Sequence, residues 1–167
     1  HMLERLQQGT DIALISDAGT PLVSDPGYRL VRAARDAGIC VSPVPGPCAA
    51  IAALSVAGLA SDRFVFEGFL PAKASARRER IGELFAEART LIFYESSHRI
   101  LETLRDLVAV FGPERQAVIA RELTKVFETV ISGSLAQLEA WVAADANQQR
   151  GEFVVMVGPS GCGKSTL

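Results

Sequence analysis

The sequence contains few cysteines and no long apolar run. Its cysteines, Cys40, Cys48 and Cys162, are odd in number and lack the spacing of metal ligands. This pattern favours reduced thiols over a disulfide framework, and it predicts no metal site. No apolar run is long enough to span a bilayer, and the polar start does not fit a signal peptide. We therefore expect a cytoplasmic protein that does not enter a membrane.

An excess of positive charge is also missing. The 167 residues include 17 Lys and Arg against 19 Asp and Glu, which gives a formal net charge of −2 at pH 7. This balance excludes a wholly basic nucleic-acid-binding surface but leaves room for a local basic patch. Apolar residues make up 49% of the chain, enough for the core of one domain or of one domain plus part of another.

The first residues predict that the chain starts inside a natural domain. His1 and Met2 resemble a tag or cloning remnant. Residues 3–8 resemble the end of a helix whose beginning is missing. The chain is therefore expected to lack the start of its first domain.

The most distinctive stretch is residues 11–28. A short apolar run, residues 12–15, predicts a buried strand, and a helix is expected over residues 28–37. The long loop between them is rich in Gly, Pro, Ser and Asp. Loops at the carboxyl ends of strands in α/β proteins hold ligands. The alternative is an ordinary connection, although such connections usually need only two to six residues.

The rest of the chain alternates strands and helices, which predicts an α/β fold. Ser97 and Ser134 are expected to cap the helices that follow them. The expected strands are residues 39–44, 63–69, 90–94, 117–120, 127–131 and 153–157, and the expected helices are residues 48–58, 71–85, 100–110 and 135–144. We expect residues 1–60 to be the carboxyl-terminal part of a first α/β domain, residues 61–157 a second α/β domain with a mixed sheet, and residues 158–167 a separate tail.

Five motifs resemble those of the tetrapyrrole (corrin/porphyrin) methylase superfamily. Three are general to it: SDAGTPLVSDPG at residues 16–27, VPGPCAA at 44–50 and ARELTK at 120–125. FLPAK at residues 69–73 and LIFYESSHR at 91–99 resemble the branch that methylates the ribose 2′-hydroxyl of a cytidine in 16S ribosomal RNA. The resemblance implies an S-adenosylmethionine-dependent transferase in rRNA processing. It also implies two α/β domains with the cofactor between them, and a homodimer.

The resemblance also implies which residues hold the cofactor. Thr20 stands where the corrin branch has an aspartate, so the loop has one carboxylate fewer and is expected to act mainly through backbone atoms. The cofactor residues implied are Gly19, Thr20, Pro21, Val23, Cys48, Ala49, Tyr94, Glu95, Gly151 and Glu152.

Methyl transfer to a ribose hydroxyl sets the remaining expectations. An in-line displacement depends on alignment, and a nearby base helps a poor nucleophile. Glu95 or Glu122 is the expected base, with Arg99, Arg121 or Lys125 holding a phosphate, and Arg121 is counted with the catalytic residues. Cations expected to contact RNA are Lys73, Arg77, Arg78, Arg80, Arg99 and Lys125. For each of these residues the alternative is a surface ion pair.

The tail, GPSGCGKSTL at residues 158–167, matches the phosphate-loop pattern G-x-x-x-x-G-K-[ST]. The chain stops where the following helix should begin, so we interpret the tail as foreign or artificial. The competing functions are a methyltransferase of a small tetrapyrrole or corrin, an ATP- or GTP-binding phosphate-loop protein using Lys164 and Ser165, and a scaffold without a ligand.

Overall fold

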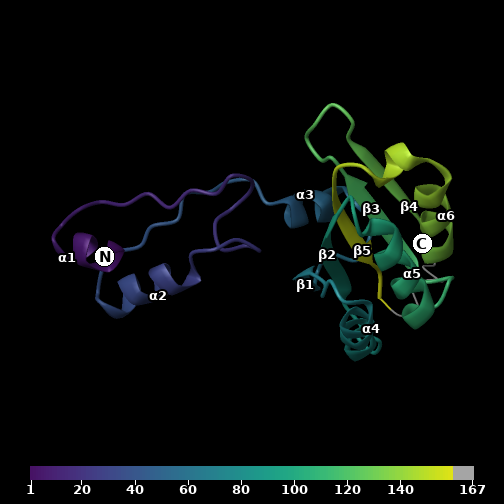
Figure 1. Cartoon of the computed structure of the whole chain (residues 1–167), viewed down its shortest axis with the longest axis horizontal. Coiled ribbons are helices and arrows are strands. Elements are labelled where there is room, and N and C mark those ends of the chain that lie inside the picture. The colour runs from purple at the N-terminus through teal and green to yellow at the C-terminus, as the bar shows by residue number, and fades with distance from the viewer. Residues whose placement is uncertain (160–167) are drawn as a thin grey trace. The chain divides into compact units, whose positions relative to one another are not determined.

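The computed structural model describes residues 1–159 and divides into two compact units, His1–Cys48 and Ala49–Leu167 (Figure 1). Helix α3, Ala49–Val56, belongs to the second unit because it contacts that unit's sheet. The division therefore lies before the domain boundary expected after residue 60, and that boundary stays a prediction. The phosphate-loop pattern continues into residues 160–167, which lie outside the described residues.

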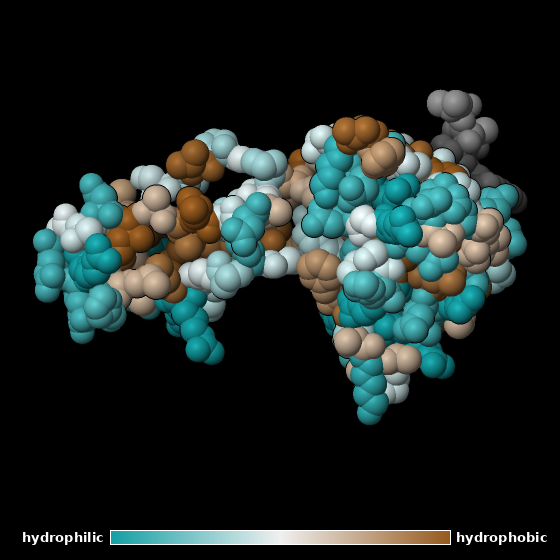
Figure 2. Space-filling model, turned by 45° about the horizontal axis from the view of Figure 1, so that its top comes forward, coloured by the Kyte–Doolittle hydropathy of each residue, from teal (hydrophilic) through white to brown (hydrophobic). Residues whose placement is uncertain are grey.

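The first unit contains two helices, α1 (Met2–Gln7) and α2 (Tyr28–Asp36), and no strand among its described residues. The prediction of α2 is confirmed, but the strands predicted over residues 12–15 and 39–44 are wrong. A strand needs a hydrogen-bonded neighbour, and neither stretch has one in the described chain. Some of their apolar side chains remain exposed, Ile15 by 83% and Val44 by 87%. Figure 2 shows apolar residues at the surface of this unit.

The second unit is built on a five-stranded mixed sheet, which confirms the predicted class. The strands are β1 (Phe64–Phe69), β2 (Thr90–Ser96), β3 (Gln116–Arg121), β4 (Thr129–Ser134) and β5 (Glu152–Val157). Their order in the sheet is β1-β2-β5-β3-β4. β1 and β2 run parallel, whereas the other neighbours run antiparallel. Of the strands described in residues 1–159, the last in sequence order therefore lies at the centre of the sheet.

Helices cover both faces of this sheet (Figure 1). Helices α4 (Ala74–Glu83), α5 (Ile100–Phe111) and α6 (Leu135–Ala144) pack on the face that carries Phe93 and Val155. Side chains alternate along a strand, so Tyr94 lies on the opposite face. There its hydroxyl accepts a hydrogen bond from the backbone N–H of Ala50 in α3, at 3.0 Å. Neighbouring positions of β2 thus face different environments.

The two helix caps predicted from serine have different outcomes. Ser134 caps α6 in a complete capping box with Gln137, as predicted. Ser97 does not cap α5, because residues 97–99 form a turn in which the Arg99 N–H bonds to the Ser96 carbonyl at 3.1 Å. The helix consequently begins at Ile100, with Arg99 at the N-cap position. Between α6 and β5 the chain forms a 3-10 helix, η1 (Ala146–Gln149).

Candidate functional site

Two loops of the first unit that were predicted to hold the cofactor lie together. The Thr20 hydroxyl donates a 2.7 Å hydrogen bond to the carbonyl of Pro47, the residue before Cys48. Gly19 has a φ of 84°, a backbone conformation that glycine adopts without strain. Pro21 lies in a turn in which the Val23 N–H bonds to the Thr20 carbonyl at 3.3 Å. The sequence did not reveal this role of Thr20, whose hydroxyl joins two segments far apart in the chain.

Tyr94, another predicted cofactor contact, lies in an aromatic cluster at the carboxyl ends of β1 and β2. Its ring packs edge-on against Phe66 and Phe69, with centroid distances of 4.9 and 5.7 Å. The hydroxyl meets the start of α3, next to Ala49. Phe69 is 55% exposed, so one side of the cluster is open to a ligand. The sequence predicted a strand over residues 63–69, but not this grouping of aromatic side chains.

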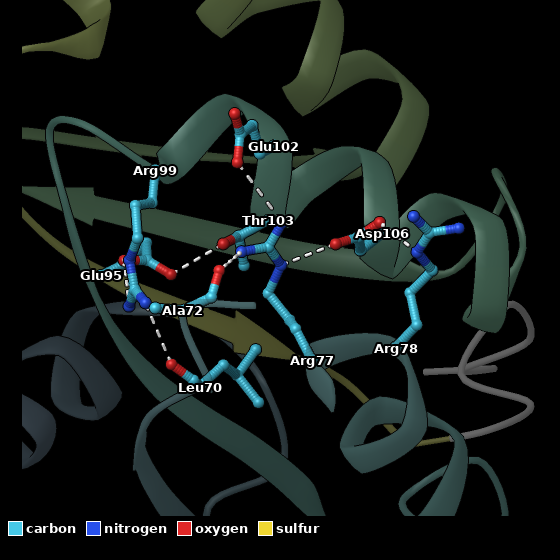
Figure 3. Close-up of polar contacts among 9 residues, drawn as sticks. All are labelled: Leu70, Ala72, Arg77, Arg78, Glu95, Arg99, Glu102, Thr103 and Asp106. Carbon is cyan, nitrogen blue, oxygen red and sulfur yellow. Dashed lines mark hydrogen bonds and ion pairs between the residues drawn. The ribbon is translucent and has the colours of Figure 1, made fainter. Parts of the chain in front are cut away.

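Glu95 differs from its expected role, because the structure encloses its carboxylate (Figure 3). Oε1 accepts hydrogen bonds from the Ser96 backbone N–H at 2.8 Å and from Arg99, whose Nη2 lies at 2.8 Å. Oε2 accepts one from the Thr103 hydroxyl at 2.7 Å. The side chain has no exposed surface. Glu95 therefore lies out of reach of a substrate proton, on the opposite sheet face from Tyr94.

The other predicted base, Glu122, lies in a polar cluster at the end of β3. Its Oε1 accepts hydrogen bonds from the Glu152 backbone N–H and from Lys125 Nζ, both at 2.9 Å. Lys125 also lies 3.0 Å from the Glu152 carboxylate. These partners, the Glu152 N–H first, lower the pKa of Glu122, while the two glutamates raise the pKa of Lys125. Because a lower pKa makes a weaker base, Glu122 is suited to accepting hydrogen bonds more than to removing protons.

Gly151 completes this cluster because a side chain there would displace Glu122. A Cβ atom at Gly151 would lie 2.6 Å from the Glu122 side chain, and its φ is 99°. Arg121 donates hydrogen bonds to the Arg150 carbonyl at 2.7 Å and to Gln148 Oε1 at 3.2 Å. The structure thus brings together residues predicted separately as catalytic, cofactor-binding and RNA-binding.

A hollow of about 690 Å³ opens beside this cluster, within the size range of small-ligand pockets. Its outer wall includes the β3–β4 loop, where Val126 is 93% and Phe127 71% exposed. Its lining includes Arg121, Glu122, Phe127, Asn147, Arg150 and Gly151. No group of His, Cys, Asp and Glu able to hold a metal occurs in residues 1–159.

The predicted basic cluster does not form a single exposed surface. Arg77 is only 1% exposed, and its Nε lies 2.6 Å from Asp106 Oδ2. This corrects its expected role as an RNA contact, because its guanidinium is used inside the protein. Arg80 pairs with Glu67 at 2.7 Å and with Glu83. Arg78 pairs with Asp106 at 3.1 Å but remains 58% exposed.

Two further cations that were predicted to contact RNA, Lys73 and Arg99, differ in their exposure. Lys73 is exposed and forms no ion pair with any described residue. Arg99 is mostly covered, with a 22% exposed side chain that faces Glu95. Two partners of these residues were not predicted from the sequence: Thr103, which bonds to Glu95, and Asp106, which pairs with Arg77. The signal that could have identified them is their position on one helix, α5, shortly after Glu95 and Arg99 in the sequence.

Comparison with known proteins gives consistent matches. The family model described as Tetrapyrrole (Corrin/Porphyrin) Methylases matches residues 1–139. The chain is 66% identical over 155 residues to the ribosomal RNA small subunit methyltransferase I of Pseudomonas aeruginosa, covering 93% of this chain and 55% of that protein. It is 59% identical over 156 residues to its counterpart in Escherichia coli O157:H7, covering 93% of this chain and 54% of that protein. The chain thus spans about half the length of the curated relatives it matches.

Solved structures share the fold at low sequence identity. The methyltransferase CobJ aligns with a TM-score of 0.67 and 23% identity, over 95% of this chain and 68% of that chain. Uroporphyrin-III C-methyl transferase from Thermus thermophilus, solved with S-adenosyl homocysteine, aligns with a TM-score of 0.58 and 20% identity, over 94% of this chain and 70% of that chain.

Proposed function

Because the chain belongs to the tetrapyrrole (corrin/porphyrin) methylase family, we propose that it is part of an S-adenosylmethionine-dependent methyltransferase of ribosomal RNA. The proposed acceptor is the ribose 2′-hydroxyl of a cytidine in 16S ribosomal RNA within the small ribosomal subunit. The observation that carries this proposal is the 59–66% identity to small-subunit rRNA methyltransferases over 93% of the chain. The whole enzyme is proposed to be a cytoplasmic homodimer. In residues 1–159 no helix combines the length and apolar character of a membrane span.

The proposed cofactor is S-adenosylmethionine, which supplies a methyl group on a positively charged sulfur. The joined loops of the first unit fit such a ligand, because Gly19, which has no side chain, lies exposed beside the hydrogen bond from Thr20 to Pro47. Tyr94 supplies an aromatic face with an exposed neighbour, Phe69. The proposed contacts are Gly19, Thr20, Pro21, Val23, Cys48, Ala49, Tyr94, Gly151 and Glu152.

The chain's own contribution to the chemistry is proposed to be alignment. Glu122, ionised near neutral pH, accepts a hydrogen bond from the acceptor hydroxyl and orients it. Lys125 remains beside it and balances the charge of the carboxylate. Exposed cations, Lys73 and Arg78, contact RNA phosphates without reading the sequence.

A tetrapyrrole acceptor is the second candidate, favoured by the fold shared with uroporphyrin-III C-methyl transferase. A small tetrapyrrole would not require exposed cations around α4. An ATP or GTP site is the third candidate, supported by the sequence pattern of residues 158–167 alone.

The test compares acceptors in a protein spanning the full length of the relatives and containing this sequence. We expect radiolabelled methyl transfer from S-adenosylmethionine to small ribosomal subunits that lack the modification, and mass spectrometry should locate it on a cytidine ribose. Transfer to uroporphyrinogen III but not to the subunit would reject the RNA proposal.

In the same methyl-transfer assay, we expect the 167-residue chain alone to transfer no methyl group, because alignment requires the rest of the enzyme.

Calorimetric titration of the 167-residue chain tests the third candidate. Titration of ATP with Mg²⁺ should give no heat of binding in either this chain or its Lys164→Ala variant. Binding that is lost in Lys164→Ala would instead support the phosphate-loop function.

A further inference from the structure

Two arginines, Arg77 in α4 and Arg99 at the N-cap of α5, hold the same short loop, residues 70–73, which joins β1 to α4. Arg99 Nη1 donates a hydrogen bond to the Leu70 carbonyl, and Arg77 Nη1 donates one to the Ala72 carbonyl, each at 3.2 Å (Figure 3). Each arginine is balanced by a buried carboxylate, Glu95 for Arg99 and Asp106 for Arg77. The two motifs FLPAK and LIFYESSHR are therefore parts of one bonded unit.

Stability alone does not account for this arrangement. Removing paired charges from water costs free energy, and apolar side chains of similar volume often stabilise a core as well or better. Short strand-to-helix loops normally expose their carbonyl groups to water, which satisfies them. The effect specific to these arginines is a fixed position for the carbonyls of Leu70 and Ala72.

The held loop and the end of β1 before it carry two groups at the protein surface. Phe69 is 55% exposed at one end and packs on Tyr94. Lys73 is exposed at the other end and has no ion-pair partner in the described part of the chain. Single-stranded RNA is bound by aromatic side chains that stack on bases and by cations that meet phosphates. Residues 69–73 thus combine both kinds of group.

We propose that Glu95, Arg99 and Thr103 are positioning residues that hold residues 70–73 so that Phe69 and Lys73 bind single-stranded RNA. This inference rests on the proposed RNA substrate and assigns a binding element to it. Thr103 acts through Glu95, and Glu95 acts through Arg99, whose guanidinium reaches the Leu70 carbonyl. A preformed loop binds more tightly because less conformational freedom is lost on binding.

The test measures binding of a labelled, cytidine-rich single-stranded RNA to the 167-residue chain by fluorescence anisotropy. Phe69→Ala and Lys73→Ala should each weaken affinity about tenfold. Arg99→Lys keeps a charge beside Glu95 but lacks the fork that reaches two acceptors, so affinity should fall about fivefold. Arg105→Lys is the matched control, because Arg105 lies on the same helix, exposed and paired with Glu139, and should have no effect.

Two further measurements separate positioning from direct contact. In Arg99→Lys, amide exchange of residues 70–73 should accelerate, and Thr103→Val should act in the same direction while Thr103→Ser preserves both exchange and affinity. In a chain that already carries Phe69→Ala and Lys73→Ala, adding Arg99→Lys should weaken affinity by less than about twofold. A full fivefold loss there would overturn the positioning role and make Arg99 itself the contact.

The inference and the proposed function fail in different ways. RNA affinity that is unchanged in Phe69→Ala and Lys73→Ala would overturn the loop as a binding element, whatever the methylation assay shows. Loop-dependent RNA binding in a protein that methylates only a tetrapyrrole would reject the proposed function and leave the loop assignment standing.

Discussion

Single residues at the end of β3 are held in conformations that an isolated chain would avoid. Glu122 has a φ of 50°, unusual for a residue other than glycine. Its backbone N–H bonds to the Glu152 carbonyl, while its carboxylate accepts the Glu152 N–H. Lys125 adds the charge that lowers the pKa of Glu122 further. Glu122 is thus held in this unusual conformation by the backbone of Glu152 and by the charge of Lys125.

This lowered pKa predicts a pH-dependent effect of Glu122→Gln on stability. Because the folded state lowers the pKa of Glu122, its contribution is complete above the ordinary glutamate pKa of about 4.3 and disappears as pH falls through the lower folded value. We expect the variant to lose about 1 kcal/mol of unfolding free energy at pH 7 and nothing at strongly acidic pH. Urea denaturation across this pH range measures it, with exposed Glu114→Gln as the control. A loss that is constant across pH would contradict the proposed pairing.

At the residue scale, the sequence supplied candidate residues but neither their grouping nor the orientation of their side chains. Motifs predicted Arg121 and Glu122 as catalytic and Gly151 as a cofactor contact, without indicating that Gly151 lies beside Glu122. They could not indicate that Glu95 points away from Tyr94, because that depends on which sheet face α5 covers. Arg77 resembles a surface cation in a basic run, and only the position of Asp106 on the next helix explains its burial.

At the scale of elements, charged side chains join α4 to α5. Asp106 accepts hydrogen bonds from Arg77 and also pairs with Arg78, so one carboxylate of α5 binds two cations of α4. Removing it leaves the buried Arg77 with one ion-pair partner among the described residues, the exposed Glu102 at 3.5 Å. An unpaired buried charge is among the most destabilising changes in a protein.

We therefore expect Asp106→Ala to lower the unfolding free energy by about 3–5 kcal/mol. Glu139→Ala, which breaks the more exposed pair with Arg105 on the neighbouring helix, should cost less than about 1 kcal/mol. Equilibrium urea denaturation of both variants supplies the comparison. Similar losses in the two would show that burial does not strengthen the Arg77–Asp106 pair.

Elements were predictable where local pattern and tertiary partners agree. The helices α2, α5 and α6 and all five strands of the sheet were expected from apolar periodicity. Residues 12–15 and 39–44 have the same strand-like composition but no pairing partner in the described chain. A sequence pattern reports a preference for strand, whereas strand formation also requires a neighbour.

At the scale of the whole molecule, the apolar core lies in one unit. Its members run from Leu70 to Val157, whereas the only buried apolar residue of His1–Cys48 is Ala34. We expect residues 49–159 alone to unfold cooperatively with a urea midpoint close to that of the whole chain. Residues 1–48 alone should show no cooperative transition by circular dichroism. A large fall in the midpoint on removing residues 1–48 would mean that the first unit stabilises the second.

The central place of β5 has a consequence for how the chain is made. Until Val157 has left the ribosome, β2 and β3 cannot be joined, since the strand that lies between them is synthesised last. The nascent chain can form only two separate strand pairs, β1 with β2 and β3 with β4, each with an open edge able to pair with other chains. Completion of the sheet is therefore a late, long-range event, of the kind that folds slowly and gives chaperones time to act.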